Sequence, residues 1–266
     1  MRKAKNGCLR LPAGETDYIR FGSGKRTLVL LPGVGDGLKT LKGTALPFAL
    51  LYGRLAGDFT IYGFSRKREL PEHYGTREMA GDLNEAMEAL GLRDAAVVGV
   101  SQGGMIAQWL AIDHPDKVGR LVLTVTAARP NDTIRDVISR WIELAQRRDY
   151  KGIMLDTAER SYSPRRLKTA RVEYRLLGSL GKPKSFDRFI TQAEACLRHD
   201  AYDRLGDIRC PTLVMGGRED KIVTGEASEE IAARIPGSQL YMYDALGHGL
   251  YEEAPDWLDR VAEFCR

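Results

Sequence analysis

The chain has few of the residues that build metal centres and disulfides. Its 266 residues include only 4 cysteines and 4 histidines. The cysteines are widely spaced and form no C-x-x-C pair, as expected for free thiols in a reducing compartment. We therefore expect a cytoplasmic protein that uses no metal and no cofactor.

Long apolar runs and a large charge of one sign are also lacking. The sequence has 40 Lys and Arg against 36 Asp and Glu, and no basic run is long enough to follow a phosphate backbone. No apolar run reaches the length of a membrane span, and no apolar segment of a signal peptide follows the basic N-terminus. We expect a small-molecule partner rather than nucleic acid or a membrane, and either a monomer or a homodimer.

What the sequence does contain is a strand that turns directly into a helix at Ser101. Residues 95–100 are apolar apart from Gly99, which is typical of a strand buried on both faces. Apolar residues recur at helical spacing from Gln102 onward. Gly99 and Gly103 leave the room that so sharp a turn needs. The segment therefore reads as a G-x-S-x-G nucleophile elbow.

Strands and helices alternate along most of the chain. Strands are predicted at 8–12, 16–21, 27–31, 59–64, 95–100, 118–125, 212–215 and 239–243, with helices at 39–56, 76–90 and 102–114 among them. This alternation predicts an α/β fold with a doubly wound, mainly parallel eight-stranded sheet. Residues 1–127 and 206–266 would form this core. Only helices are predicted in residues 128–205, which we interpret as a helical cap inserted after the sixth strand.

A serine hydroxyl needs a neighbouring base, and a carboxylate must fix the tautomer of that base. Of the histidines, only His248 follows the last predicted strand, where two glycines flank it. Asp220 follows the preceding buried strand and is our choice for the carboxylate, with Glu219 and Asp244 as rivals. The order Ser101, Asp220, His248 is the order expected for a triad on this type of sheet.

Attack by a serine creates an oxyanion, which backbone N–H groups can stabilise. One donor is predicted at Gln102, at the start of a helix. The glycine-rich turn after the strand at 27–31 can supply the other, and Val34 is our choice within it. The turn lacks the lysine of a phosphate-binding loop and the third glycine of a dinucleotide fingerprint.

The elbow at 99–103, Asp220, His248 and the turn Pro32-Gly33-Val34 resemble the α/β-hydrolase family. The stretches 195–200 and 204–214 look more specifically like 3-oxoadipate enol-lactonase-like hydrolases and carboxylesterases. The resemblance implies hydrolysis of a small ester, lactone or thioester through an acyl-enzyme on Ser101. It also departs from the family at one point, because members often have His-Gly where this chain has Pro32-Gly33.

Other functions stay open on the sequence alone. The same triad could cleave a carbon–carbon bond or transfer an acyl group, as in perhydrolysis, and the fold could serve as a ligand receptor. Residues 129–205 carry 17 Lys and Arg against 11 Asp and Glu. If this excess reflects an anionic substrate rather than solvated helix faces, Arg129 is the first candidate to bind it.

Overall fold

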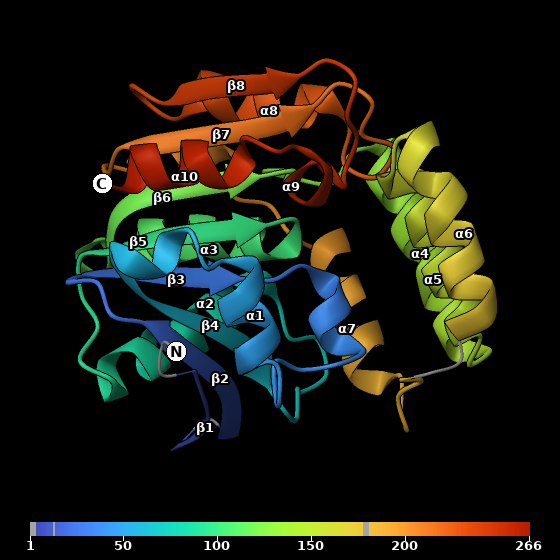
Figure 1. Ribbon diagram of the computed structural model, residues 1–266, viewed down its shortest axis with the longest axis horizontal. Helices are drawn as coiled ribbons and strands as arrows, with labels where there is room; N and C mark the ends of the chain where they lie inside the picture. The colour runs from blue at the N-terminus through green and yellow to red at the C-terminus, as the bar shows by residue number, and fades with distance from the viewer. Residues whose placement is uncertain (1–3, 13, 178–180) are drawn as a thin grey trace.

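A computed structural model describes residues 4–12, 14–177 and 181–266 (Figure 1). It contains one sheet of eight strands in the order β1-β2-β4-β3-β5-β6-β7-β8. All neighbouring strands from β4 to β8 run parallel, and β2 is antiparallel to both β1 and β4. The strands are β1 (Lys5–Leu11), β2 (Gly14–Gly22), β3 (Arg26–Leu31), β4 (Phe59–Lys67), β5 (Ala95–Val100), β6 (Val118–Thr124), β7 (Thr212–Gly217) and β8 (Gln239–Tyr243). The predicted eight-stranded, mainly parallel sheet is confirmed.

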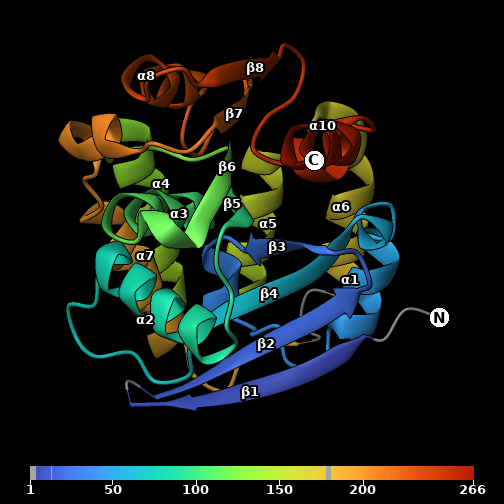
Figure 2. The same cartoon turned by 90° about the vertical axis from the view of Figure 1, so that its left-hand side faces the viewer.

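Helices cover both faces of the sheet (Figure 2). One face carries α2 (Thr76–Ala89), α3 (Gln102–Asp113) and α8 (Gly225–Arg234), and the other carries α1 (Ala45–Leu51) and α10 (Trp257–Cys265). A short helix, α9 (Leu250–Glu253), precedes α10. In β5, Val97 packs with the first helix layer and its neighbours Ala96 and Val98 with the second. Because successive side chains of a strand point to opposite faces, this strand is apolar throughout.

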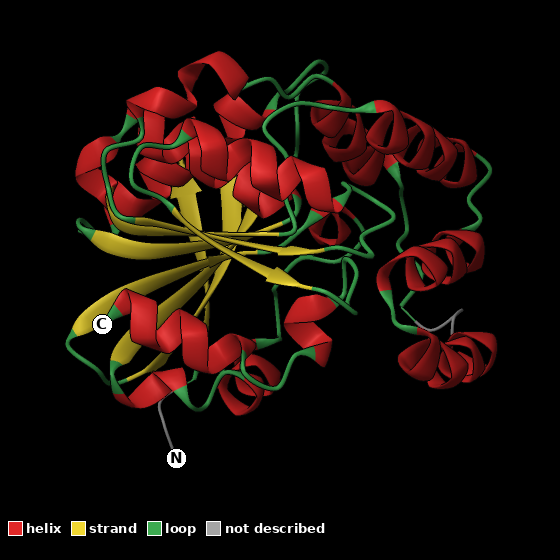
Figure 3. Ribbon diagram, turned by 90° about the horizontal axis from the view of Figure 1, so that it is seen from above, coloured by secondary structure: helices red, strands yellow, loops and turns green. Residues whose placement is uncertain are grey.

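Between β6 and β7 the chain forms α4 (Asp132–Gln146), α5 (Tyr150–Ser161), α6 (Pro164–Leu177) and α7 (Asp187–Leu197). These helices lie beyond the carboxyl ends of the strands (Figures 1 and 3). Their apolar side chains, among them Ile138, Trp141 and Phe189, pack with Val34 and Met105 of the sheet domain. The segment leaves and rejoins that domain at one point, where the Ala201 N–H donates to the Ala128 carbonyl at 2.8 Å.

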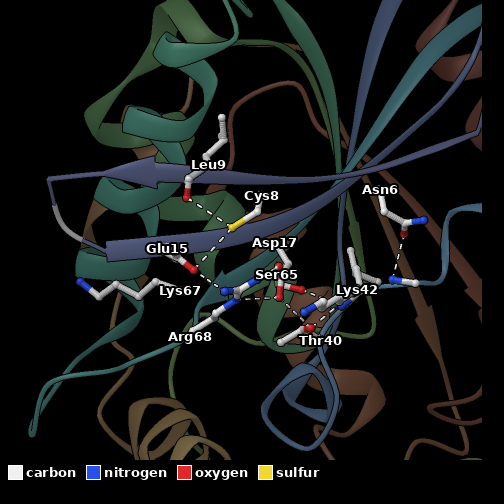
Figure 4. Close-up of polar contacts among 12 residues, drawn as sticks. Asn6, Cys8, Leu9, Glu15, Asp17, Thr40, Lys42, Ser65, Lys67 and Arg68 are labelled. Atoms are coloured by element: carbon white, nitrogen blue, oxygen red, sulfur yellow. Dashed lines mark hydrogen bonds and ion pairs between the residues drawn. The ribbon is translucent and has the colours of Figure 1, made fainter.

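Among the element boundaries that differ from the prediction, two lie close to the candidate site. The helix expected at 39–56 is only α1, because Gly43 has φ +83° and the residues before α1 are held by polar contacts instead (Figure 4). The Leu41 N–H donates to the Ser65 hydroxyl at 2.8 Å, and the Thr40 hydroxyl donates to Asp17 at 3.0 Å. The fourth strand, expected to end at residue 64, continues to Lys67 with its last three side chains buried.

Asp156 of α5 joins α5 to α4. Its carboxylate accepts hydrogen bonds from Arg140 at 2.7 Å, from the Trp141 indole at 2.8 Å and from Arg160 at 2.8 Å. Burial alone would raise the pKa of Asp156, but the hydrogen bonds from Arg160, Trp141 and Arg140 hold it below the ordinary value. The ionised carboxylate therefore stabilises the folded chain.

We expect Asp156→Asn to lower the free energy of unfolding by about 1–3 kcal/mol, because hydrogen bonds to a charged group are lost. Urea unfolding at pH 7 measures this change. The deficit should shrink as the pH falls below about 4, because a group with a lowered pKa loses its stabilising effect when it is protonated. Glu159→Gln is the control, since Glu159 pairs with Arg171 where both side chains are half exposed, and it should cost under about 1 kcal/mol. An equal cost for both variants would contradict this role of Asp156.

Candidate active site

Ser101 lies between the end of β5 and the start of α3, with no residue of loop on either side. Its φ of +54° and ψ of −123° are strained for a residue with a side chain. The flanking glycines permit this turn. A Cβ on Gly103 would lie 2.1 Å from the Leu31 carbonyl oxygen, and one on Gly99 would lie 2.5 Å from the Gly103 carbonyl oxygen. The strand-turn-helix predicted around Ser101 is therefore present.

Asp220 and His248 come together from two different loops. Asp220 follows β7, His248 follows β8, and the His248 Nδ1 lies 2.8 Å from an oxygen of the Asp220 carboxylate. The other carboxylate oxygen accepts the N–H groups of Ile222 at 2.8 Å and Val223 at 3.0 Å. Both side chains are buried. This arrangement fixes the imidazole with a proton on Nδ1 and leaves Nε2 free to act as a base.

The rival carboxylates lie elsewhere. Asp244 is 87% exposed and accepts a hydrogen bond from Arg218 at 2.8 Å, on the surface. Glu219 is exposed as well. A second buried histidine, His199, lies 2.8 Å from the Thr76 hydroxyl, between α2 and α7. Burial lowers the pKa of His199 to about 3, so this imidazole is a neutral part of the packing.

Ser101 and His248 line the same cavity of about 390 Å³. Gly33 and Val34 line it as well. Most of the remaining wall is apolar. It comes from the segment before α1, from α1 itself and from the helices between β6 and β7, with Leu38, Leu41, Phe48, Trp141, Ile153, Met154 and Phe189. The cavity is therefore a mainly apolar chamber beside the Ser101 hydroxyl and the His248 imidazole, with the charged residues Asp36 and Lys39 also in its wall.

Two helix starts place backbone N–H groups beside Ser101. Gln102 is the first residue of α3, and Val34 is the first residue of the 3₁₀ turn η1 (Val34–Gly37). Within the described residues, neither N–H donates to a backbone or side-chain acceptor, as expected at helix starts. Gly33 holds the turn against the elbow, since a Cβ there would lie 3.3 Å from the Ser101 Cβ.

The structure does not bring Arg129 to this cavity. Its guanidinium donates to Glu230 of α8 at 2.6 Å and lies over the Tyr202 ring at 3.7 Å. The side chain is about half exposed, and Arg129 is not part of the cavity wall. A charge count over a helical segment does not tell which way one side chain points, and here it points outward.

We therefore expect Arg129→Lys to change KM by the same factor for an acidic ester and for a neutral ester of equal size. The exposed pair with Glu230 contributes little, so this factor should stay below about two. Initial rates on the two esters measure it. A selective rise in KM for the acidic ester would return Arg129 to the substrate site.

The residues that sequence reasoning missed are the apolar wall of the cavity. Trp141, Ile153 and Phe189 lie on amphipathic helices, and the sequence pattern identifies their apolar faces but not what those faces cover. Among the described residues, no group of three or more His, Cys, Asp or Glu side chains could hold a metal ion, and no helix is long and apolar enough to span a membrane.

Known proteins share both the sequence pattern and the fold. The chain is 29% identical over 191 residues, 71% of either chain, to RutD of Caulobacter sp. (strain K31), which is named for carbamate hydrolysis. It is 27% identical to 2-hydroxy-6-oxononadienedioate/2-hydroxy-6-oxononatrienedioate hydrolase 2 of Pseudomonas putida, over 95% of this chain and 93% of that one. The enol-lactonase of Burkholderia xenovorans LB400 superposes with a TM-score of 0.82 at 21% identity, over 97% and 99% of the chains, and shares the fold. Residues 28–255 match the family described as the alpha/beta hydrolase fold, so the chain belongs to the α/β-hydrolase family.

Proposed function

We propose that this α/β hydrolase cleaves a small carboxylic ester, lactone or thioester through an acyl-enzyme on Ser101. His248 acts as the general base and Asp220 orients it. The N–H groups of Val34 and Gln102 stabilise the oxyanion. The reaction needs no metal and no cofactor, because the nucleophile, the base and the donors are all supplied by the chain.

The observation that carries this proposal is the placement of Ser101 and His248 on one cavity, with Asp220 hydrogen-bonded to the far side of the imidazole. The strained backbone at Ser101 also supports the proposal, because strained backbone conformations cluster at functional sites in proteins. The mainly apolar wall favours an acyl group of modest size with a largely apolar body.

In this mechanism the Ser101 oxygen attacks the carbonyl carbon while His248 Nε2 takes the hydroxyl proton. The tetrahedral intermediate collapses as the leaving oxygen or sulfur receives that proton. A water molecule then attacks the acyl-enzyme, again losing its proton to Nε2, and collapse of the second intermediate releases the acid and restores Ser101. Asp220 stays ionised throughout and stabilises the imidazolium form.

A fluorophosphonate probe tests the nucleophile directly. We expect one covalent adduct per chain, located at Ser101 by peptide mass spectrometry, and loss of activity in proportion to labelling. A panel of p-nitrophenyl esters and lactones would then rank substrates. A folded chain that is not labelled and cleaves no member of the panel would support a ligand receptor on this fold instead.

Carbon–carbon bond hydrolysis is the second candidate, because the relative from Pseudomonas putida that matches 95% of this chain is named for a dienedioate substrate. The two functions separate on one comparison. A C–C hydrolase should cleave a vinylogous diketone far faster than any p-nitrophenyl ester, whereas an esterase should show the reverse order.

A further inference from the structure

A buried polar cluster joins α7 to the turn after β3, to the end of β4 and to the first residue of α3. It consists of Asp36 of η1, Arg66 near the end of β4, Arg188 and Gln192 of α7, and Gln102 of the elbow. All are buried except for a small exposed part of Arg188, whose side chain is 14% exposed. None of these side chains is needed for the chemistry proposed above, so the cluster requires a separate explanation.

Arg188 connects α7 to both the turn after β3 and the end of β4. Its guanidinium donates to the Asp36 carboxylate at 2.5 Å, to the Asp36 carbonyl, to the Lys67 carbonyl at 3.0 Å and to the Arg66 carbonyl at 2.8 Å. The first two acceptors belong to the turn that begins at Val34. One side chain of α7 therefore holds the backbone of that turn and the end of β4 together.

The same turn is held from its other side by Arg66. The Arg66 guanidinium donates to the Pro32 carbonyl at 2.6 Å, and the Arg66 N–H donates to the Asp36 carboxylate at 3.1 Å. Pro32 and Asp36 stand two residues before and two residues after Val34. The orientation of the Val34 N–H is therefore fixed by bonds on both sides of it.

The elbow is tied to α7 as well. The Gln102 side-chain amide donates to the Gln192 carbonyl at 2.5 Å, and the Gln192 amide lies 3.5 Å from the Asp36 carboxylate. Backbone packing reinforces these bonds, since a Cβ on Gly37 would lie 2.6 Å from the Phe189 Cα. Both N–H donors, those of Val34 and Gln102, are thus held against one helix.

We propose that Arg188 is a positioning residue, through which α7 sets the spacing between the Val34 and Gln102 N–H groups that receive the oxyanion. The inference rests on the proposed serine mechanism and adds to it a role for the helices between β6 and β7. These helices then wall the cavity and also assemble the oxyanion site, so a substrate bound while α7 is displaced would react slowly.

The charge balance makes Arg188 the residue to change. The cluster holds two arginines and one aspartate, and burial lowers the pKa of Arg66 only to about 10, so Arg66 is charged at neutral pH. Removal of Arg188 leaves one buried cation, Arg66, and one buried anion, Asp36, so the cluster has no net charge. Removal of Asp36 would instead leave two cations in the cluster with no carboxylate to balance them, and we expect such a chain to fold poorly.

The test compares Arg188→Met with Arg198→Met, a control at the end of the same helix whose side chain is 41% exposed and pairs only weakly with Glu194, at 3.6 Å. We expect Arg188→Met to lower kcat for a p-nitrophenyl ester about tenfold to a hundredfold, less than complete loss of an oxyanion donor. KM should stay within about threefold. The inhibition constant of phenylboronic acid, whose Ser101 adduct is tetrahedral, should rise by the same factor as kcat falls.

If Arg188 is merely structural, Arg188→Met would lower the melting temperature but leave the ratio of the phenylboronic acid inhibition constant to KM unchanged. That result would overturn the proposal. If Arg188→Met does not fold, Gly37→Ala replaces it, since the added methyl forces the turn away from α7 while every charge is kept. It should give the same fall in kcat. Failure of the serine mechanism can be distinguished from failure of the role proposed for Arg188, because in the first case the fluorophosphonate would not label the unmodified chain.

Discussion

Ser101→Ala is expected to lower kcat by a factor on the order of 10⁴ to 10⁶, because the covalent step loses its nucleophile and no neighbouring group replaces it. The variant should fold normally. Alanine and serine both carry a Cβ, so the strain of φ +54° is the same in each. Steady-state kinetics on the best ester of the panel measures the loss, and thermal unfolding checks the fold.

Ser23→Ala is the matched control, since Ser23 is exposed and precedes β3, at the opposite end of the sheet from Ser101. It should keep full activity and full labelling. The Ser101→Ala variant should lose labelling altogether. Retention of activity within tenfold of the unmodified chain would remove Ser101 from the mechanism.

Asp220→Asn is expected to lower kcat/KM about 10³- to 10⁴-fold, although the two side chains have nearly the same size. The asparagine amide can present an N–H to His248 Nδ1, which favours the tautomer with a proton on Nε2, and that tautomer cannot accept the Ser101 proton. The bonds from Ile222 and Val223 should keep the loop in place. Kinetics across a pH range separates the variant from an unfolded one.

Asp244→Asn provides the comparison within the same pair of loops. Its carboxylate lies on the surface with Arg218, so kcat/KM should stay within about twofold. A larger loss in Asp244→Asn than in Asp220→Asn would mean that the loop carrying His248 takes another arrangement during turnover, with the second carboxylate behind the imidazole.

The strands around Ser101 could be predicted because they depend on local signals. A strand buried on both faces is apolar at almost every position, and a turn without room for side chains requires glycine. The sequence of residues 95–103 therefore predicts both the buried strand and the sharp turn. His248 could be chosen because only one histidine follows the last strand. These signals need no knowledge of what packs against the segment.

The remainder depends on contacts between distant segments. Residues 39–44 fall within the helix predicted at 39–56, but the hydrogen bonds of Thr40 and Leu41 to Asp17 and Ser65 decide their path. The end of β4 is polar in sequence and buried in the structure, because Arg66 finds its partners on the turn after β3. A sum of charges makes Arg129 only a candidate for substrate binding, whereas the direction of its side chain is set by Glu230 on a helix about a hundred positions away.

The hydrogen bond between Ala128 and Ala201 has a consequence for how such proteins diversify. Because the two ends of the intervening segment meet at one point, we expect changes in its length and sequence to leave β6 in place relative to β7. Evolution or protein engineering could then exchange these seventy-odd residues as one unit while the sheet stays unchanged. This unit is not fully independent of the sheet domain, however. If Arg188 positions the turn at Asp36 as proposed, a replacement without its own anchor for that turn should bind its new substrate and turn it over more slowly, by about the tenfold to hundredfold expected of Arg188→Met.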